Sequence, residues 1–146
     1  MIQRLNFYKA SPDAAKALMA LETVLPRLSI EPLLIDLVKL RASQINGCAY
    51  CVDMHTHDAR KKGETERRLY AVAVWRETPF FTPRERAALA WTEALTRVAD
   101  THAPDADYAQ MREAFNDQES VDLTLVIGAI NVWNRFGVGY RLSPAA

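Results

Sequence analysis

Residues 31–63, "EPLLIDLVKLRASQINGCAYCVDMHTHDARKKG", hold both cysteines of the chain and two of its three histidines. Apolar residues recur at helical spacing from Pro32 up to Gly47, and glycine is the residue that most often follows a helix end. A second helix then begins near Cys48 and ends before Gly63. The stretch therefore predicts two consecutive helices that bend at Gly47 into a hairpin.

The rest of the chain carries signals for helix starts and helix stops, and it lacks the period-two alternation of strands. Thr82 and Glu85, for example, have the spacing of a capping box. No linker or internal repeat divides the sequence. It therefore predicts one all-α domain over residues 1–146, with six or seven helices. Outside the hairpin, the expected helices cover residues 12–25, 66–75, 82–99, 105–115 and 120–136, the last closed by Gly137.

Length and composition restrict the class of protein. The chain has 146 residues, of which 49% are hydrophobic, and this is enough for a core that needs no disulfide. Its 18 basic and 18 acidic residues cancel, so no broad field of one sign attracts nucleic acid or an anionic membrane. The sequence shows neither a signal-peptide core nor an apolar run of membrane-spanning length. We therefore expect a soluble, cytosolic protein without nucleic-acid or membrane partners.

The two cysteines lie one helical turn apart at the expected start of the second hairpin helix. Thiols are kept reduced in the cytosol, so neighbouring cysteines there suggest metal or redox chemistry before a structural crosslink. Free backbone N–H groups and the helix dipole favour a thiolate at this position. Cys48 and Cys51 are also placed to form a disulfide with little backbone motion.

His55 distinguishes the two thiols. It follows Cys51 by four residues, which places their Cβ atoms roughly 5–6 Å apart on one helix face. Cys48 is about 10 Å of helix rise away from His55, too far for direct contact. This favours Cys51 as the thiol that attacks a peroxide, Cys48 as the thiol that resolves the sulfenic acid, and His55 as the proton shuttle. The helix N-terminus acts in the opposite direction, since it favours Cys48 as the more acidic thiol.

The segment "LIDLVKLRASQINGCAYCVDMHTHDARKKGE" resembles the core of the AhpD-like alkylhydroperoxidases in the carboxymuconolactone decarboxylase superfamily, which have an acidic residue twelve positions before C-x-x-C-x-x-x-H. Asp36, Cys48, Cys51 and His55 occupy these positions. "ERAALAWTEALT" and "INVWNRFGVGYR" resemble the peroxidase-related branch. The resemblance implies an all-helical subunit that forms trimers or hexamers, and a hydroperoxide-reducing disulfide cycle in which Cys51 is peroxidatic. It also suggests a lipoyl-bearing protein or a peroxiredoxin as the thiol reductant. We expect no cofactor and no bound metal.

Two positions depart from the AhpD pattern. The acidic residue, commonly glutamate, is the shorter Asp36, and Tyr50 stands between the cysteines where AhpD has histidine. This leaves a shortened proton relay. In an antiparallel hairpin Asp36 comes level with His55, where its carboxylate would orient the imidazole.

Other interpretations of the same residues remain open. Cys48 and Cys51 could be buried apolar residues, or could bind zinc with His55 and Asp36, although no second ligand pair completes such a site. Asp36 could instead support Lys39 on a solvated helix face. The alternative functions are a non-catalytic redox or metal sensor and gamma-carboxymuconolactone decarboxylase-like activity, although the founding decarboxylases lack the cysteine pair.

The remaining polar and aromatic candidates receive structural assignments. His57 and Asp53 are expected on the surface, and His102 in a proline-flanked loop. Helix packing or an interface contact is the expected role of Asn131, Asn134 and Arg135. Five large aromatic residues are expected in the core or between subunits: Trp75, Phe80, Phe81, Trp91 and Trp133.

Overall fold

The computed structural model describes residues 2–144, and every regular element among them is helical. The prediction of an all-α fold is confirmed. The α-helices are α1 (Phe7–Ala10), α2 (Pro12–Val24), α3 (Pro32–Asn46), α4 (Ala49–Lys61), α5 (Glu66–Ala71), α6 (Pro83–Thr96), α7 (Val98–Thr101), α8 (Asp105–Ala114) and α9 (Asp117–Tyr140). Two 3₁₀ segments, η1 (Leu25–Arg27) and η2 (Val72–Glu77), follow α2 and α5.

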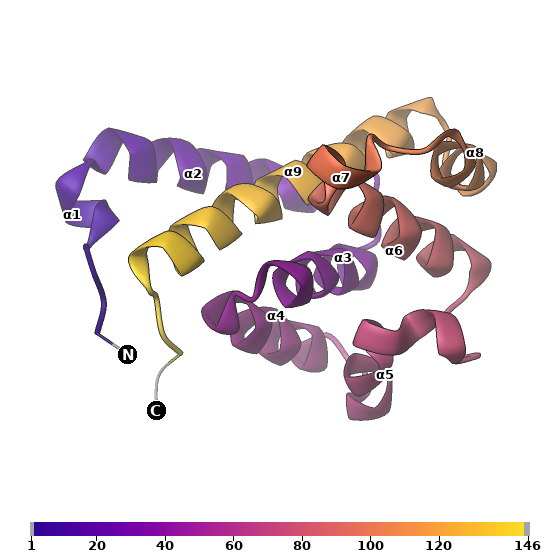
Figure 1. The fold of residues 1–146 in the computed structure, drawn as a ribbon, viewed down its shortest axis with the longest axis horizontal. Coiled ribbons are helices and arrows are strands. Elements are labelled where there is room, and N and C mark those ends of the chain that lie inside the picture. Colours follow the sequence, from indigo (N-terminus) through magenta and orange to yellow (C-terminus); the bar gives the residue numbers. More distant parts are fainter. Residues whose placement is uncertain (1, 145–146) are drawn as a thin grey trace.

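Helix α3 is the centre of the fold. It packs against α4, α6 and α9, which surround it (Figure 1). Its residues are buried almost all round, and Leu37 and Val38 have no exposed surface. A helix enclosed on several sides is expected to be apolar over most of its circumference. The polar residues that α3 carries inward, Asp36, Lys39 and Ser43, therefore need partners inside the protein.

The α3–α4 hairpin forms as the sequence predicts. Gly47 follows α3 in the left-handed conformation, with φ of 67°, and its N–H bonds to the carbonyl groups of Ser43 and Gln44. A residue with a Cβ atom is disfavoured there, whereas glycine adopts this conformation freely. Cys48 is the N-cap of α4, which begins one residue later than expected. The bend at Gly47 thus places the first cysteine at the start of α4.

The last helix differs most from the prediction. Asn116 and Glu119 form a capping box, so α9 begins at Asp117, three residues before the expected start. It continues through Gly137, the residue that is expected to close it, and ends at Tyr140. Glycine in a helix interior costs about 0.5–1 kcal/mol relative to alanine, which is why it is read as a stop. The reason it is tolerated here lies in the packing of α9 against the cysteines.

Smaller differences concern helix ends. Helix α5 gives way to the 3₁₀ segment after Ala71, before the expected end at residue 75. The capping box of Thr82 and Glu85 is confirmed at the start of α6, which ends at Thr96 and is followed by the separate α7. The four-residue α1 is not expected from the sequence, because it is shorter than the pattern needed to recognise a helix.

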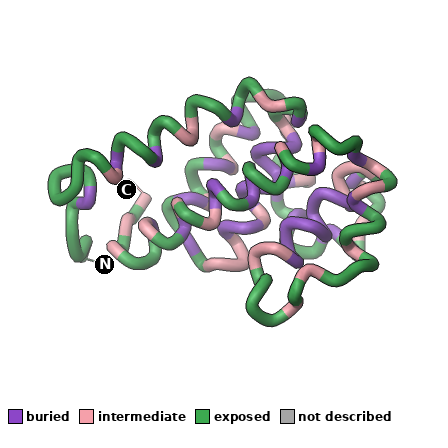
Figure 2. The backbone as a smooth tube through the Cα atoms, turned by 90° about the horizontal axis from the view of Figure 1, so that it is seen from above, coloured by how far each residue is buried: buried purple, intermediate pink, exposed green. Residues whose placement is uncertain are grey.

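The N-terminal segment closes back on the end of α9. Phe7, only 3% exposed, packs edge-on against Trp133 and Phe136. The Arg4 N–H donates to the Tyr140 carbonyl at 3.0 Å. Helices α1 and α2 otherwise remain largely exposed, while the interior helices carry most of the buried residues (Figure 2).

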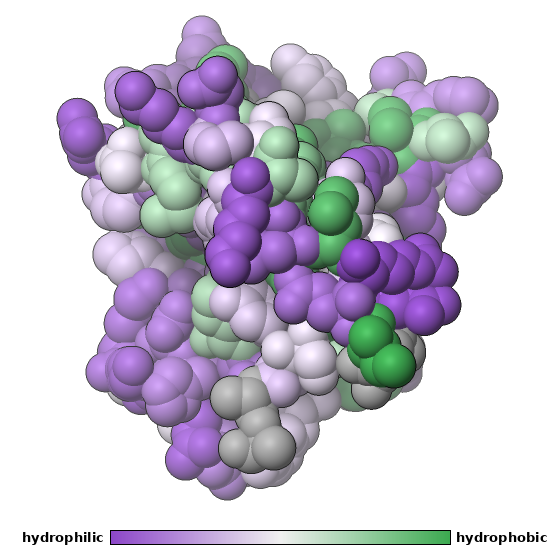
Figure 3. Space-filling model, turned by 90° about the vertical axis from the view of Figure 1, so that its left-hand side faces the viewer, coloured by the Kyte–Doolittle hydropathy of each residue, from purple (hydrophilic) through white to green (hydrophobic). Residues whose placement is uncertain are grey.

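Three of the large aromatic residues, Trp75, Phe81 and Trp91, are buried within the single chain. They therefore give no support to the expected interface between subunits. On the side of the molecule that carries both chain ends, hydrophobic residues form separate small patches among hydrophilic ones (Figure 3). Among the described residues, no helix is both long enough and apolar enough to span a bilayer.

Candidate functional site

The two cysteines meet at the N-terminus of α4. Their Cα atoms are 5.4 Å apart and their sulfur atoms lie at disulfide-bonding distance. The Cys51 backbone N–H donates to Cys48 Sγ at 3.4 Å, so the first cysteine caps the helix with its sulfur. Both side chains are 2% exposed. The geometry predicted from the spacing is thus present, in a site that is almost closed to water.

Gly137 of α9 lies directly against the sulfur atoms. A Cβ added at this position would stand 2.5 Å from Cys48 Sγ and 3.5 Å from Cys51 Sγ. Contacts of 2.5 Å are not found for real Cβ atoms, so only glycine fits without a shift of the cysteine. Gly137 is therefore a site residue that the sequence interpretation assigned to a helix end. Nothing in the local sequence distinguishes these two roles.

A chain of side-chain hydrogen bonds fixes α9 to the end of α3. Asn46 donates to Asn131 at 3.0 Å and to Asn134 at 2.9 Å, and Asn134 donates in turn to Ser43 at 2.9 Å. Asn134 is 1% exposed, and these bonds satisfy its buried amide. The expectation of helix packing is confirmed for Asn131 and Asn134. Their bonds hold the helix that carries Gly137 against the loop that carries Cys48.

His55 lies on the buried face of α4, one turn after Cys51 and one turn before Ala59. It is 5% exposed, and its Nε2 atom has no hydrogen-bond partner among the described residues. Burial, followed by the positive charges of Lys39 and Lys62, lowers the pKa of His55 from 6.5 to about 3. The imidazole is therefore neutral at physiological pH, and it can accept a proton only when one is delivered inside the site.

Asp36 is buried as a site residue would be, but its carboxylate does not orient His55. Asp36 Oδ2 instead accepts a hydrogen bond from Lys62 Nζ at 2.6 Å, across the open end of the hairpin. Burial raises the pKa of Asp36 above its ordinary value, and the Lys62 contact offsets only part of that effect. The expected contact between the Asp36 carboxylate and His55 is therefore wrong. Asp36 instead pairs with Lys62, whose positive charge lowers the pKa of His55.

Lys39 forms a second ion pair beside the site. Its Nζ atom lies 2.7 Å from Glu22 Oε2 of α2, with the lysine side chain 7% exposed. The alternative that Asp36 supports Lys39 on a solvated face is wrong, because both residues are buried and each has a different partner.

A cavity of about 580 Å³ opens beside these groups, between the N-terminal helices and the α3–α4 hairpin. His55 and Tyr50 line it from α4, Asp36 and Lys39 from α3, and Trp133 from α9. Trp133 also packs on the cluster formed by the two cysteines, Ala42 and Ile130. Trp133 thus borders both the cavity and the cysteine cluster, and His55 lines the cavity from the buried face of α4 that also carries Cys51. Tyr8, Met19, Glu22, Leu25, Pro26, Pro32, Ile35, Met54, Asp58 and Lys62 complete the lining.

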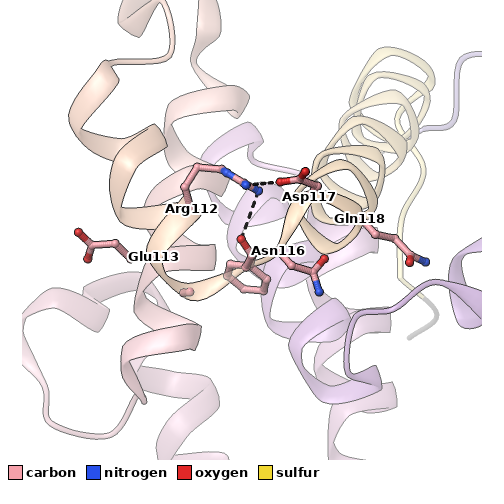
Figure 4. A pocket seen from close by; sticks show the side chains of 7 residues that line it. Arg112, Glu113, Asn116, Asp117 and Gln118 are labelled. Carbon is pink, nitrogen blue, oxygen red and sulfur yellow. Dashed lines mark hydrogen bonds and ion pairs between the residues drawn. The ribbon is translucent and has the colours of Figure 1, made fainter.

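A second hollow, of about 550 Å³, lies at the turn between α8 and α9, far along α9 from the cysteines. Figure 4 shows Arg112 pointing toward Asp117, with which it forms an ion pair. Arg112 also donates to Ser120 Oγ at 2.7 Å and to the Phe115 carbonyl at 3.3 Å. These polar groups satisfy one another's hydrogen-bonding capacity. We therefore interpret the hollow as a structural feature of the turn before α9.

The other predicted site residues are placed as follows. His57 and Asp53 are exposed on α4, and His102 is the exposed residue that ends α7. Within residues 2–144, no three histidine, cysteine, aspartate or glutamate side chains are grouped closely enough to hold a metal ion.

The sequence model of the Carboxymuconolactone decarboxylase family matches residues 12–94, more than half of the 146-residue chain. The chain belongs to this family. The assignment suggested by the C-x-x-C-x-x-x-H motif is confirmed.

Relatives of this family member share nearly its whole length. It is 43% identical over 138 residues to the uncharacterized protein YdfG of Bacillus subtilis, with 94% of each chain covered. Its fold matches, with a TM-score of 0.97 and 48% identity over 99% of each chain, a protein of unknown function from Agrobacterium tumefaciens. A role as the antioxidant defence protein AhpD has been suggested for that protein. A peroxidase-related protein from Ralstonia eutropha, described as an alkylhydroperoxidase AhpD core, shares the fold with a TM-score of 0.83 at 22% identity, over 95% of this chain and 74% of that one.

The buried, neutral His55 makes stability depend on pH. The unfolded chain binds a proton at His55 below pH 6.5, whereas the folded chain resists protonation down to about pH 3, so stability is lost as the pH falls through this window. At pH 5 the expected loss is about 2 kcal/mol relative to pH 7. The raised pKa of Asp36 has the opposite sign, because the folded carboxyl binds its proton at higher pH than the unfolded one.

Urea unfolding at pH 7 and pH 5 tests this, with His55→Gln compared against the exposed control His57→Gln. The Asp36 contribution is common to all the proteins and cancels in the comparison. We expect the parent and His57→Gln to lose about 2 kcal/mol more than His55→Gln on acidification. Equal losses in all three would mean that His55 is not held neutral.

Proposed function

We propose that this protein is a thiol-dependent hydroperoxide reductase that cycles Cys48 and Cys51 between dithiol and disulfide. One observation carries the proposal: the two sulfur atoms lie at bonding distance, at a helix N-terminus, on the same side of α4 as a neutral histidine that faces a cavity. A disulfide that forms reversibly needs such paired sulfurs, and peroxide reduction also needs a group that moves protons.

In the first step the Cys51 thiol attacks the terminal oxygen of the hydroperoxide as its proton passes to His55. The sulfur–oxygen bond forms while the oxygen–oxygen bond breaks, and the departing alkoxide takes the proton back from His55. The products are Cys51 sulfenic acid and an alcohol, so sulfur is oxidised by two electrons and the peroxide is reduced by two. The imidazole starts the step neutral, with an Nε2 atom that has no hydrogen-bond partner among the described residues, although its low pKa makes it a weak base.

In the second step Cys48 attacks the Cys51 sulfenic sulfur, forming the disulfide and releasing water. Cys48 is suited to this because its sulfur caps α4, where backbone N–H groups stabilise the thiolate. In the sequence, the helix N-terminus favours Cys48 as the more acidic thiol, whereas His55 favours Cys51 as the attacking thiol. In this mechanism both effects are used: the helix N-terminus activates the resolving thiol, and the histidine serves the attacking thiol.

The disulfide then returns to the dithiol by exchange with a reducing thiol. Following the sequence expectation, we propose a lipoyl-bearing protein or a peroxiredoxin as the source of this dithiol, in the cytoplasm. We also retain the proposal of a homo-oligomer, trimeric or hexameric, to be measured by light scattering.

The test is intact mass and thiol counting before and after one equivalent of cumene hydroperoxide in metal-free buffer, followed by peroxide consumption with a supplied dithiol. Both free thiols should disappear, the mass should fall by two hydrogens, and consumption should be catalytic. A single oxidation without turnover would instead favour the redox sensor. Loss of γ-carboxymuconolactone without peroxide consumption would favour the decarboxylase.

The ion pair beside His55 provides a further prediction. Asp36→Asn leaves the Lys62 charge uncompensated near His55 and lowers the histidine's proton affinity further, so the general base weakens. General acid–base help is worth ~10²- to 10⁴-fold, and we expect a loss on the order of tenfold in the rate of thiol oxidation. The double variant Asp36→Asn/Lys62→Met removes both charges and should recover most of that rate.

Stopped-flow oxidation of the reduced protein measures these rates, and alkylation of Cys51 against pH reports on the thiol itself. Rates and alkylation curves that coincide for the parent, the single variant and the double variant would remove Asp36 from the site.

A further inference from the structure

We propose that the cavity beside His55 binds neutral, apolar hydroperoxides and discriminates against those that carry a carboxylate. This inference rests on the proposed function and specifies its substrate class. It is carried by the lining of the cavity and by the way its charges are already paired.

The cavity is larger than peroxide chemistry alone requires. Its volume of about 580 Å³ lies in the range of cavities that enclose small organic ligands. Much of the wall is apolar, and it includes Leu25, Pro26, Ile35, Met54 and Trp133. Such a surface gains free energy by burying a hydrocarbon group and gains nothing from hydrogen peroxide.

The position of the cavity gives the ligand a direction. Tyr50 adjoins Cys51 in the chain, Trp133 packs on the cysteine cluster, and His55 shares the buried face of α4 with Cys51. A hydroperoxide group that reaches the sulfur therefore points toward His55. Its organic substituent is left in the part of the cavity lined by α2, η1 and the start of α3.

The charges on the wall leave no cation for an anionic substituent. Two ammonium groups line the cavity, and each already contacts a carboxylate: Lys39 binds Glu22 at 2.7 Å, and Lys62 binds Asp36 at 2.6 Å.

Asp58 adds a third carboxylate to the lining, and His55 is neutral. A substrate carboxylate would have to displace a protein carboxylate from a short ion pair, or remain buried without a partner, which is costly. A neutral substituent meets neither obstacle.

Direct binding tests the inference without relying on turnover. The probes are 2-phenyl-2-propanol, the alcohol formed from cumene hydroperoxide, and its para-carboxylate, titrated calorimetrically into the oxidised protein. We expect the neutral alcohol to bind at least ten times more tightly. Equal or tighter binding of the carboxylate, or no binding of either probe, would overturn the inference.

Glu22→Gln provides a variant with a gain of binding. It leaves Lys39 without its carboxylate partner. The buried ammonium group should then donate a charge-assisted hydrogen bond to the carboxylate of the probe. The para-carboxylate should then bind on the order of tenfold more tightly than to the parent, since 1.4 kcal/mol corresponds to a factor of ten. Glu113→Gln is the matched control, because Glu113 is exposed on α8 and outside the cavity. It should leave both affinities unchanged.

Peroxide consumption, measured in parallel with cumene hydroperoxide and its para-carboxylate, separates the two proposals. Consumption without selective binding would overturn the cavity inference alone. Selective binding by a protein that consumes neither hydroperoxide would overturn the proposed function, and with it the assignment of the ligand as substrate. A preference for the neutral compound in both measurements supports the inference.

Discussion

We expect Cys51→Ser to abolish hydroperoxide consumption, and Cys48→Ser to react once and stop with an oxidised Cys51. This is the largest effect that we expect from a single substitution. Serine cannot form a sulfenic acid, so the first variant lacks the attacking atom altogether. The second retains the attacking thiol beside His55 but lacks the sulfur that would condense with the product.

Intact mass after one equivalent of cumene hydroperoxide distinguishes these outcomes. Cys48→Ser should gain one oxygen, and dimedone should trap the sulfenic acid, or two chains should become linked through Cys51. The parent should lose two hydrogens, and Cys51→Ser should form no dimedone adduct. The opposite pattern would make Cys48 the attacking thiol, as its position at the helix N-terminus would allow. Turnover by Cys48→Ser at the parent's rate would remove its resolving role.

Gly137→Ala should destabilise the protein by about 1–3 kcal/mol, because its methyl group overlaps Cys48 Sγ and has to displace the sulfur or bend α9. In the same helix, an added Cβ at Gly128 meets no heavy atom within 4 Å. Gly128→Ala should therefore stabilise the protein by about 0.5–1 kcal/mol, the usual gain of alanine over glycine in a helix. Two identical changes in one helix are thus expected to have opposite signs.

Urea unfolding of the oxidised proteins measures both stabilities. A matched comparison in the Cys48→Ala background, which has no Sγ atom at the point of overlap, should remove most of the cost of Gly137→Ala. Peroxide oxidation of reduced Gly137→Ala should also be slowed, since the two sulfurs can no longer take their parent positions together. If Gly128→Ala and Gly137→Ala change stability equally in the parent, or if Gly137→Ala costs as much in the Cys48→Ala background as in the parent, the contact with the cysteine is not the cause.

The sequence by itself determined the features that depend on neighbouring residues. The spacing of Cys51 and His55 is fixed by the helix repeat once α4 forms, so both lie on its buried face. Gly47 ends α3 because the left-handed conformation is local, and Thr82 with Glu85 starts α6 because the two groups of a capping box are three residues apart. The C-x-x-C-x-x-x-H motif from Cys48 to His55 also indicated the family, which the match over residues 12–94 confirms.

Tertiary structure alone decided the features that depend on which distant residues meet. Asp36 binds Lys62, 26 residues away, and not the histidine that lies on the same hairpin. The neutrality of His55 follows from burial and from the charges of Lys39 on α3 and Lys62 after α4, which no spacing in the sequence encodes. From the sequence of α9 alone, Gly137 cannot be distinguished from a glycine that ends a helix. Only the packing of α9 onto the cysteines requires a residue without a side chain at this position. Local patterns fix backbone geometry, whereas pairing, proton affinity and close approach are set by how the helices pack.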